Sequence, residues 1–300
     1  MDNLGYCCLN QTLRADKIYT DRKLIRRTFT MEKAADLALQ NCKDLLTILK
    51  WNAKHNIKVF RITSNLFPRM TDPQQGYRFT ELATHKECEK ALNEAGKFAF
   101  DNQMILSSHP GPYTVLSSPR DSVVERSTQD IVCHYELGEM LKADAPDLQF
   151  HINFHIGTKF DQANGDRFCK SFDALPEKVK SAIIIENDDK ASCWSILKLY
   201  DHIYSRVGTP LTFDYHHSKF SREPDIPVDY EFAIAKRTWI DRNCKQETHY
   251  SSSDNNTPKH SDYVLETIPD WMTKDDSIYI HLEVKAKELA LIKYRESNRE

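Results

Sequence analysis

AIIIEN (182–187) is a short apolar run that ends in two polar residues, and IKVFRI (57–62) is a second run of the same length. Runs this short and this apolar are typical of strands that are covered on both faces, as in parallel sheets. Comparable runs alternate along the chain with amphipathic segments of helical period. The other expected strands cover 4–9, 104–109, 149–156, 211–217, 246–251 and 277–284, and the main expected helices cover 31–55, 82–102, 121–143 and the residues from 285 onward.

Eight strands, each followed by a helix-compatible segment, predict an α/β fold, a single (β/α)₈ TIM-type barrel over residues 1–300. A doubly wound open sheet is the main alternative. It is disfavoured because the Gly-rich phosphate-binding turn of that fold is missing after the first strand.

Composition restricts the function classes. Lys and Arg total 41 against 44 Asp and Glu, a net charge of −3, so a polyanionic partner must bind a local basic patch. The eight cysteines form no CxxC pair, and we expect buried, reduced thiols in an intracellular protein, cytoplasmic or nuclear. No apolar run approaches the roughly 20 residues of a membrane span. No signal peptide is recognised, and a monomer is expected.

Ionisable residues gather at the ends of six consecutive expected strands. In a barrel these ends meet at one rim, where active sites are built. Buried there without partners, such groups would carry a large desolvation cost, which divalent cations remove. A single strand-end histidine is more often structural, but six strands in succession are hard to dismiss. The residues are His109, His155, Glu186, Asp214, His217, Glu247, His249 and Glu283.

Two further histidines are interpreted differently. His151 shares a strand face with His155 but lies one layer deeper, so we expect a structural role. His216 should point away from His217, so only one of the two faces the metal site. Mixed imidazole and carboxylate ligands suit Mn²⁺, Zn²⁺ or Fe²⁺ better than Ca²⁺.

Eight motifs occur in order over residues 4 to 290. Together they closely resemble the UV-damage endonuclease family, barrel relatives of endonuclease IV. The motifs are LGYCCLN (4–10), RITSNLFP (61–68), HPGPYTVLSSP (109–119), HIG (155–157), IENDD (185–189), FDYHH (213–217), THYSS (248–252) and LEVKAKE (282–288).

The resemblance implies two or three divalent cations, with Mn²⁺ expected and Zn²⁺ or Mg²⁺ as alternatives. Glu186 is expected to bridge two of them, because a carboxylate has two oxygens. The catalytic residues expected are Glu186, Glu247 and Tyr6. The implied metal ligands are His109, His155, Glu186, Asp214, His217, His249, His260 and Glu283.

The resemblance also implies the reaction and the partner. A metal-activated water would cut damaged double-stranded DNA immediately 5′ of cyclobutane dimers and 6-4 photoproducts, leaving a 3′-hydroxyl and a 5′-phosphate without ATP. Residues 11–31 carry six basic and two acidic residues, and we expect this segment to contact phosphates. The expected DNA contacts are Asn10, Arg14, Lys17, Tyr113, Tyr250 and Lys285.

Two positions depart from the family pattern. Pro112 replaces a glutamine that, with the following aromatic residue, is thought to wedge into the duplex opposite the lesion, which leaves Tyr113 alone to stack. Glu247 replaces a lysine that can be carboxylated, so activity should not depend on dissolved CO₂. Three alternatives stay open: a metal-dependent sugar isomerase or epimerase, a damage-binding module without catalysis, and a nuclease for abasic sites.

Overall fold

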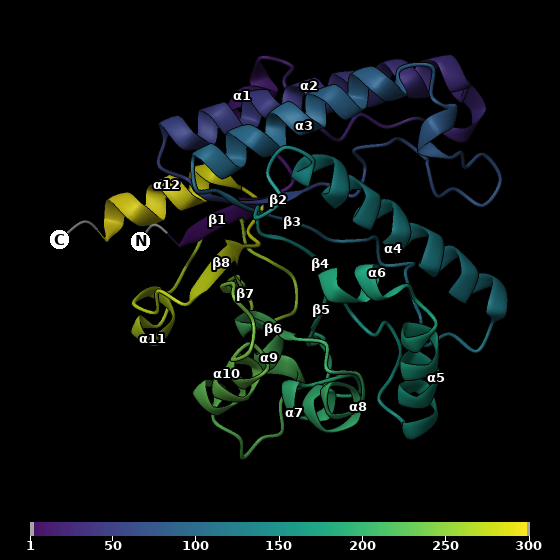
Figure 1. The fold of residues 1–300 in the computed structure, drawn as a ribbon. Coiled ribbons are helices and arrows are strands. Elements are labelled where there is room, and N and C mark those ends of the chain that lie inside the picture. Colours follow the sequence, from purple (N-terminus) through teal and green to yellow (C-terminus); the bar gives the residue numbers. More distant parts are fainter. Residues whose placement is uncertain (1–2, 299–300) are drawn as a thin grey trace.

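The computed structural model describes residues 3–298, which form a closed barrel of eight parallel strands in chain order (Figure 1). Every neighbouring pair of strands is parallel, including β1 with β8, which closes the barrel. The predicted (β/α)₈ fold is confirmed. The strands are β1 (Leu4–Cys7), β2 (Val59–Ile62), β3 (Ile105–Ser108), β4 (Phe150–Phe154), β5 (Ile183–Glu186), β6 (Leu211–Asp214), β7 (Gln246–Tyr250) and β8 (Ile278–Leu282).

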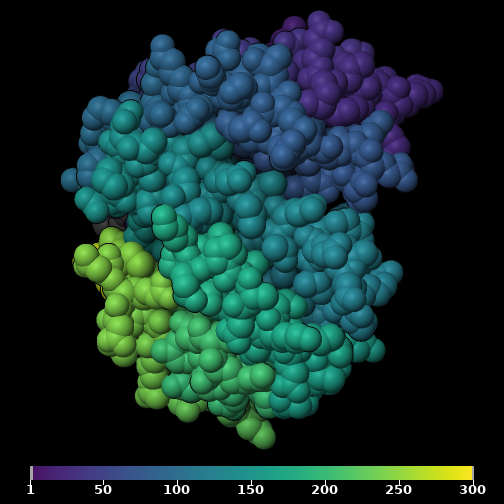
Figure 2. Space-filling model, turned by 45° about the vertical axis from the view of Figure 1, so that its right-hand side comes forward, coloured from purple at the N-terminus to yellow at the C-terminus, as the bar shows by residue number. Residues whose placement is uncertain are grey.

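Helices surround the barrel, and the chain order is visible on the surface, from purple and blue at the top to green and yellow at the lower left (Figure 2). The helical elements are α1 (Gln11–Ala15), η1 (Arg26–Thr28), α2 (Met31–Lys54), η2 (Phe79–Glu81), α3 (His85–Asp101), α4 (Asp121–Lys142), α5 (Gln162–Asp173), α6 (Glu177–Ala182), α7 (Ile196–Leu199), the π-helical η3 (Tyr200–Tyr204), α8 (Ser205–Val207), α9 (Tyr215–Ser221), α10 (Val228–Arg237), α11 (Asp270–Thr273) and α12 (Glu288–Ser297).

The long helices α2, α3 and α4 lie side by side and cover one side of the barrel (Figure 1). Thr30 begins α2, because its side chain accepts a hydrogen bond from the Lys33 amide. Gly96 allows α3 to approach α4 closely: a Cβ built at this position would lie 1.7 Å from the carbonyl oxygen of Leu141. The sequence therefore permits this packing only with glycine at that position.

The predicted strand over 211–217 is wrong in its second half. β6 ends at Asp214, and the two histidines that follow lie on α9. Asp214 caps this helix, since its Oδ1 accepts a hydrogen bond from the His217 amide at 2.7 Å. His216 and His217 therefore diverge because of helical geometry, not because of strand alternation. His216 turns to the carbonyl oxygen of Thr257.

The barrel interior below the rim is polar. The Ser107 hydroxyl lies 2.9 Å from His281 Nε2, and His151 Nδ1 lies 3.2 Å from the hydroxyl of Tyr279. Burial lowers the pKa of His151 to about 4 and that of His281 to about 3, although Glu247 opposes both shifts. These neutral, hydrogen-bonded imidazoles have the structural role that was predicted for His151.

All eight cysteines are free thiols. Within residues 3–298, no helix combines the length and the apolar character that a membrane span requires.

Candidate metal centre

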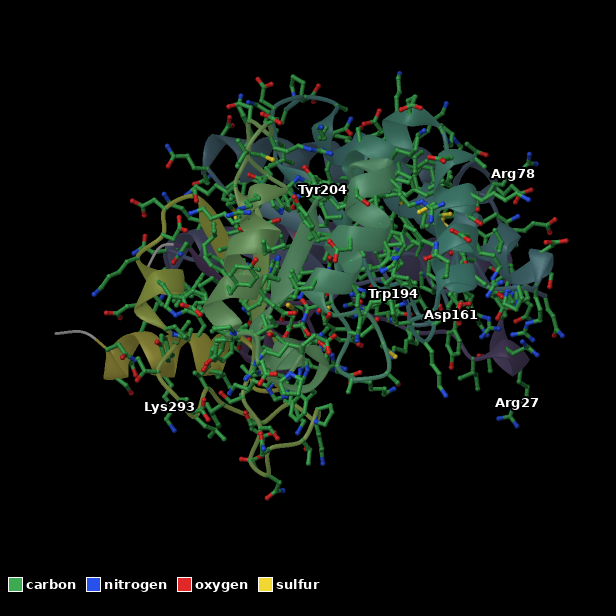
Figure 3. All side chains as sticks on the ribbon, turned by 90° about the horizontal axis from the view of Figure 1, so that it is seen from below. Arg27, Arg78, Asp161, Trp194, Tyr204 and Lys293 are labelled. Carbon is green, nitrogen blue, oxygen red and sulfur yellow. The ribbon has the colours of Figure 1, made fainter. Side chains whose placement is uncertain are left out.

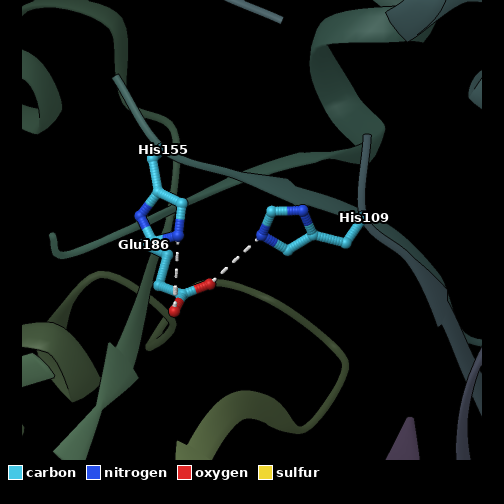
Figure 4. Close-up of side chains that lie close together, drawn as sticks. All are labelled: His109, His155 and Glu186. Carbon is cyan, nitrogen blue, oxygen red and sulfur yellow. Dashed lines mark ion pairs between the residues drawn. The ribbon is translucent and has the colours of Figure 1, made fainter. Parts of the chain in front are cut away.

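Glu186 lies at the centre of the polar rim, at the carboxyl end of β5, with only 1% of its surface exposed. Four imidazoles converge on its carboxylate. His217 Nδ1 and His249 Nδ1 lie 3.1 and 3.2 Å from its oxygens. His109 Nε2 and His155 Nε2 lie 3.5 and 3.7 Å from the same carboxylate (Figure 4). These four histidines, which the sequence analysis expected at the ends of different strands, therefore form a single cluster.

Two groups in this cluster have the geometry to hold a metal ion, and both contain Glu186. One is His109, His155 and Glu186; the other is Glu186, Asp214 and His249. In each group the potential ligand atoms lie within 4.8 Å of one another. Since a carboxylate has two oxygens, Glu186 can serve both groups, as expected for a bridging ligand.

The donors of the second group fit a divalent cation. His249 Nδ1, Glu186 Oε1 and Asp214 Oδ2 are buried and have no hydrogen-bond partner. Buried polar atoms without partners are rare in folded proteins, and a bound ion is one of the few explanations for them. Imidazole nitrogen together with carboxylate oxygen is a donor set that transition-metal cations accept.

The carboxylates of the cluster favour positive charge at two of the imidazoles, those of His217 and His249. Burial alone would lower the pKa of His217, but Asp214 and Glu186 outweigh it and raise the pKa to about 10. The pKa of His249 is raised well above its usual value against the same effect of burial, mainly by Glu186 and Glu283. The same negative surroundings favour a bound cation, and metal binding would release protons from these rings, since a ligating histidine is neutral.

Glu283 and His260, two further predicted ligands, lie at the edge of the cluster. Glu283 follows β8, and its Oε1 is 3.2 Å from His249 Nδ1. His260 Nδ1 is hydrogen-bonded to the main-chain oxygen of Glu283, and its ring centroid lies 6.1 Å from that of His217. The structure therefore brings all eight predicted ligands to one end of the barrel.

Glu247 lies on the opposite side of the His249 ring. Its Oε1 is 3.0 Å from His249 Nε2, while Nδ1 of the same ring faces Glu186. Its Oε2 accepts a 2.6 Å hydrogen bond from the hydroxyl of Tyr279. Burial would raise the pKa of Glu247, but the contacts with His249 and His281 lower it to about 2. A carboxylate behind a ligating histidine fixes the orientation of its ring.

Three residues at the site escaped the sequence analysis. Arg61 on β2 forms a largely buried ion pair with Glu283, and Asn153 on β4 donates a hydrogen bond to Glu186. Asp188 Oδ1 lies 3.7 Å from His155 Nδ1. The sequence contains features that could have identified two of them. Arg61 is a charged residue within an apolar strand, and Asp188 is the second acidic residue in the polar stretch that begins with Glu186 at the end of β5. No sequence signal distinguished Asn153.

Three expected roles need correction, those of Tyr6 as a catalytic residue and of Asn10 and Tyr250 as DNA contacts, because all three side chains are completely buried. The Tyr6 hydroxyl donates to Asn52 Oδ1 at 2.7 Å and accepts from Asn10 Nδ2 at 2.9 Å, and burial raises its pKa. Tyr6 and Asn10 thus stabilise the region beneath the first loop, whereas Tyr250 stacks on the ring of Tyr215. The same burial leaves the Tyr6 hydroxyl without access to a scissile phosphate.

Tyr113, Arg14, Lys17 and Lys285 are exposed, as a DNA contact requires. Tyr113 is the most prominent of them, with 89% of its surface exposed. Lys285 lies 3.6 Å from Asp262, and its side chain is still half exposed.

The basic segment 11–31 has less free charge than its composition predicts. Arg22 is paired with Asp44 at 2.7 Å and is largely buried, and Arg14 is paired with Asp21 at 3.0 Å. Arg27 projects from the periphery of the molecule (Figure 3). Part of the net charge of +4 of this segment is thus neutralised by ion pairs within the protein.

The fold and the site together define a (β/α)₈ barrel whose rim carries a buried His, Asp and Glu cluster suited to metal ions. The family model described as UV-endonuclease UvdE matches residues 2–298, so the chain belongs to this family. The resemblance that the motifs indicated is confirmed.

Individual relatives agree with the family assignment. The "UV-damage endonuclease" of Schizosaccharomyces pombe is 30% identical over 96% of this chain, which spans only 49% of that protein. The "UV DNA damage endonuclease" of Clostridium perfringens is 30% identical over 97% of this chain and 69% of that protein. The crystal structure of SacUVDE superimposes with a TM-score of 0.83 and 26% identity, over 98% of this chain and 97% of that chain.

Proposed function

We propose that this protein is a metal-dependent endonuclease that cuts damaged double-stranded DNA at UV photoproducts. The observation that carries the proposal is the cluster of four imidazoles around Glu186, in a chain of the UvdE family. The proposed cut lies immediately 5′ of cyclobutane dimers and 6-4 photoproducts and leaves a 3′-hydroxyl and a 5′-phosphate without ATP. The working unit is a monomer.

Two or three divalent cations, with Mn²⁺ as the expected ion, would be held by the predicted ligands. When bound, such ions lower the pKa of water toward neutrality and stabilise negative charge on phosphate oxygens. The ligands are His109, His155, Glu186, Asp214, His217, His249, His260 and Glu283.

The chain itself supplies orientation and charge at this site. Glu247 fixes the ring of His249 from behind, and Arg61 holds the carboxylate of Glu283. Tyr113 is free to stack on bases, and the exposed Lys17 and Lys285 can contact phosphates. Extruding a damaged base costs least where its pairing is already weakened, which favours damaged over intact duplex.

The test is incision of three end-labelled duplexes, in Mn²⁺ and in EDTA. One duplex is undamaged, one carries a single thymine dimer and one carries an abasic site. We expect Mn²⁺-dependent cutting directly 5′ of the dimer, and its loss in Glu186→Gln. The surface variant Glu94→Gln removes the same charge from α3 and should cut normally.

Other outcomes separate the alternatives. If only the abasic duplex is cut, the protein is a nuclease, but its substrate is an abasic site and not a UV photoproduct. Absence of cutting in the metal-loaded wild type would refute the nuclease and favour small-molecule chemistry at the same metal centre.

A further inference from the structure

The exposed Tyr113 stands at the tip of a tight turn in the loop after β3. The Thr114 amide donates a 3.0 Å hydrogen bond to the carbonyl oxygen of Gly111, which closes a β-turn of four residues. Pro112 occupies the second position of this turn, where its fixed φ is favourable, and Tyr113 occupies the third. The residue that replaces the family glutamine therefore restricts the backbone that presents the aromatic ring.

The residues after Tyr113 are anchored to α4. The Thr114 hydroxyl donates to Asp130 Oδ2 at 2.5 Å, and the Val115 amide donates to Ser127 Oγ at 2.7 Å. Asp130 and Ser127 are three residues apart and lie on the same face of the helix. Two consecutive hydrogen bonds thus hold the end of the turn against a rigid element.

Asp130 also holds the neighbouring loop, which follows β2. Its other oxygen, Oδ1, accepts a 2.9 Å hydrogen bond from the hydroxyl of Thr71. The two loops form the walls of a groove of about 730 Å³ that includes Tyr113, Asp130 and the exposed Lys23. Among residues 3–298, no ion pair within 4.0 Å involves Asp130, so threonine hydroxyls are its main partners.

We propose that Asp130 is a positioning residue for damage recognition, which fixes the Tyr113 turn before DNA is bound. The inference rests on the proposed function and deepens it. A ring that is already in place loses less conformational entropy when it enters the duplex, so more of the stacking energy is available to open a damaged step. The rigid turn at Pro112 acts in the same direction, because proline reduces the freedom of the unbound loop.

Thr114→Val tests this role, because valine keeps the shape of threonine and removes only the donor to Asp130. We expect KM for the dimer-containing duplex to rise about tenfold, the order that follows from losing one hydrogen bond to a charged group. The kcat should stay within about twofold, since the metal ligands do not change. Thr209→Val is the matched control: this buried threonine donates one 3.0 Å hydrogen bond to Ile183, at the opposite end of the barrel.

A double-mutant cycle with Tyr113→Ala distinguishes positioning from a purely structural role. If Asp130 acts through the ring, Thr114→Val should change KM less than about twofold in the Tyr113→Ala background. An equal rise in both backgrounds would overturn the proposal, and so would a loss confined to kcat or matched by Thr209→Val.

Pro112→Ala is a second, milder variant for the case that Thr114→Val does not fold. This variant breaks no hydrogen bond but makes the turn more flexible. KM should therefore rise only when Tyr113 is present. An unchanged KM would overturn the proposal. Absence of incision by the wild type would refute the proposed function instead, which keeps the two failures distinct.

Discussion

At the residue scale, Glu186 belongs to both groups that could hold a metal ion. Four imidazoles surround its buried carboxylate, and its pKa is well below the usual value because His249 and His155 outweigh the effect of burial. A glutamine at this position would keep the shape and lose the charge. Its loss should therefore affect both candidate ion positions together.

Glu247 provides the prediction at this scale. Glu247→Gln removes the negative charge behind His249 and should weaken Mn²⁺ binding about 10- to 100-fold, the range for partners that orient a ligating histidine. Calorimetric titration of Mn²⁺ into EDTA-treated protein measures this effect. Glu139→Gln, on the exposed surface of α4, is the control and should bind as the wild type does.

An unchanged Mn²⁺ affinity in Glu247→Gln would contradict the orienting role. Because the carboxylate of Glu247 needs no modification, wild-type activity should also be equal in CO₂-depleted and in bicarbonate-containing buffer.

At the scale of elements, α3 and α4 support loops on the rim that carries the candidate metal centre. The loop after β2 leads to α3, and the loop that carries Tyr113 leads to α4. Both helices depend on a close backbone approach at Gly96, which lies against the carbonyl oxygen of Leu141. A change at this contact would move the framework that positions Asp130.

Gly96→Ala is therefore expected to destabilise the protein, although alanine has the higher helix propensity. The added methyl meets backbone that no side-chain rotation can clear, and overpacking of this kind costs about 1–3 kcal/mol. Urea unfolding measures the change in the free energy of unfolding. Lys90→Ala, exposed on the same helix, should change it by no more than about 0.5 kcal/mol. Equal stability of the two variants would show that the helices can separate without cost.

At the scale of the whole molecule, the candidate ligands join strands and loops from β3 to β8. His109 follows β3, and Glu283 follows β8, so a cation in the cluster would connect most of the barrel.

Mn²⁺ should therefore raise the melting temperature of EDTA-treated protein. At a free concentration 100 times the Kd, binding to the folded state alone adds about 2.7 kcal/mol of stability. Thermal unfolding over a series of Mn²⁺ concentrations measures the shift, and Glu186→Gln should largely abolish it. A wild-type melting temperature that does not respond to Mn²⁺ would argue against a metal site in this cluster.

Local sequence patterns were sufficient to predict the barrel and the composition of its rim. Short apolar runs indicate strands, and segments with apolar residues at helical spacing indicate the helices between them. In a parallel barrel the carboxyl ends of all strands lie at one edge. Residues such as His109, Glu186 and His249 could therefore be assigned to one site without coordinates. The family motifs then supplied His260, which lies in a loop and has no periodic signal.

Which side chains face the site and which lie beneath it depends on long-range contacts that no local pattern encodes. Tyr6 is bonded to Asn52, 46 residues away, and Arg61 is paired with Glu283, 222 residues away. Asp130 joins two loops that are distant from each other in the chain. The spacing of apolar residues and the sequence motifs indicate which face of a helix or strand a residue lies on. The contacts named here depend instead on how separate helices and strands pack against one another. Burial therefore excludes Tyr6, Asn10 and Tyr250 from the molecular surface, and the hydrogen bond from Thr114 connects Asp130 to the turn that carries Tyr113.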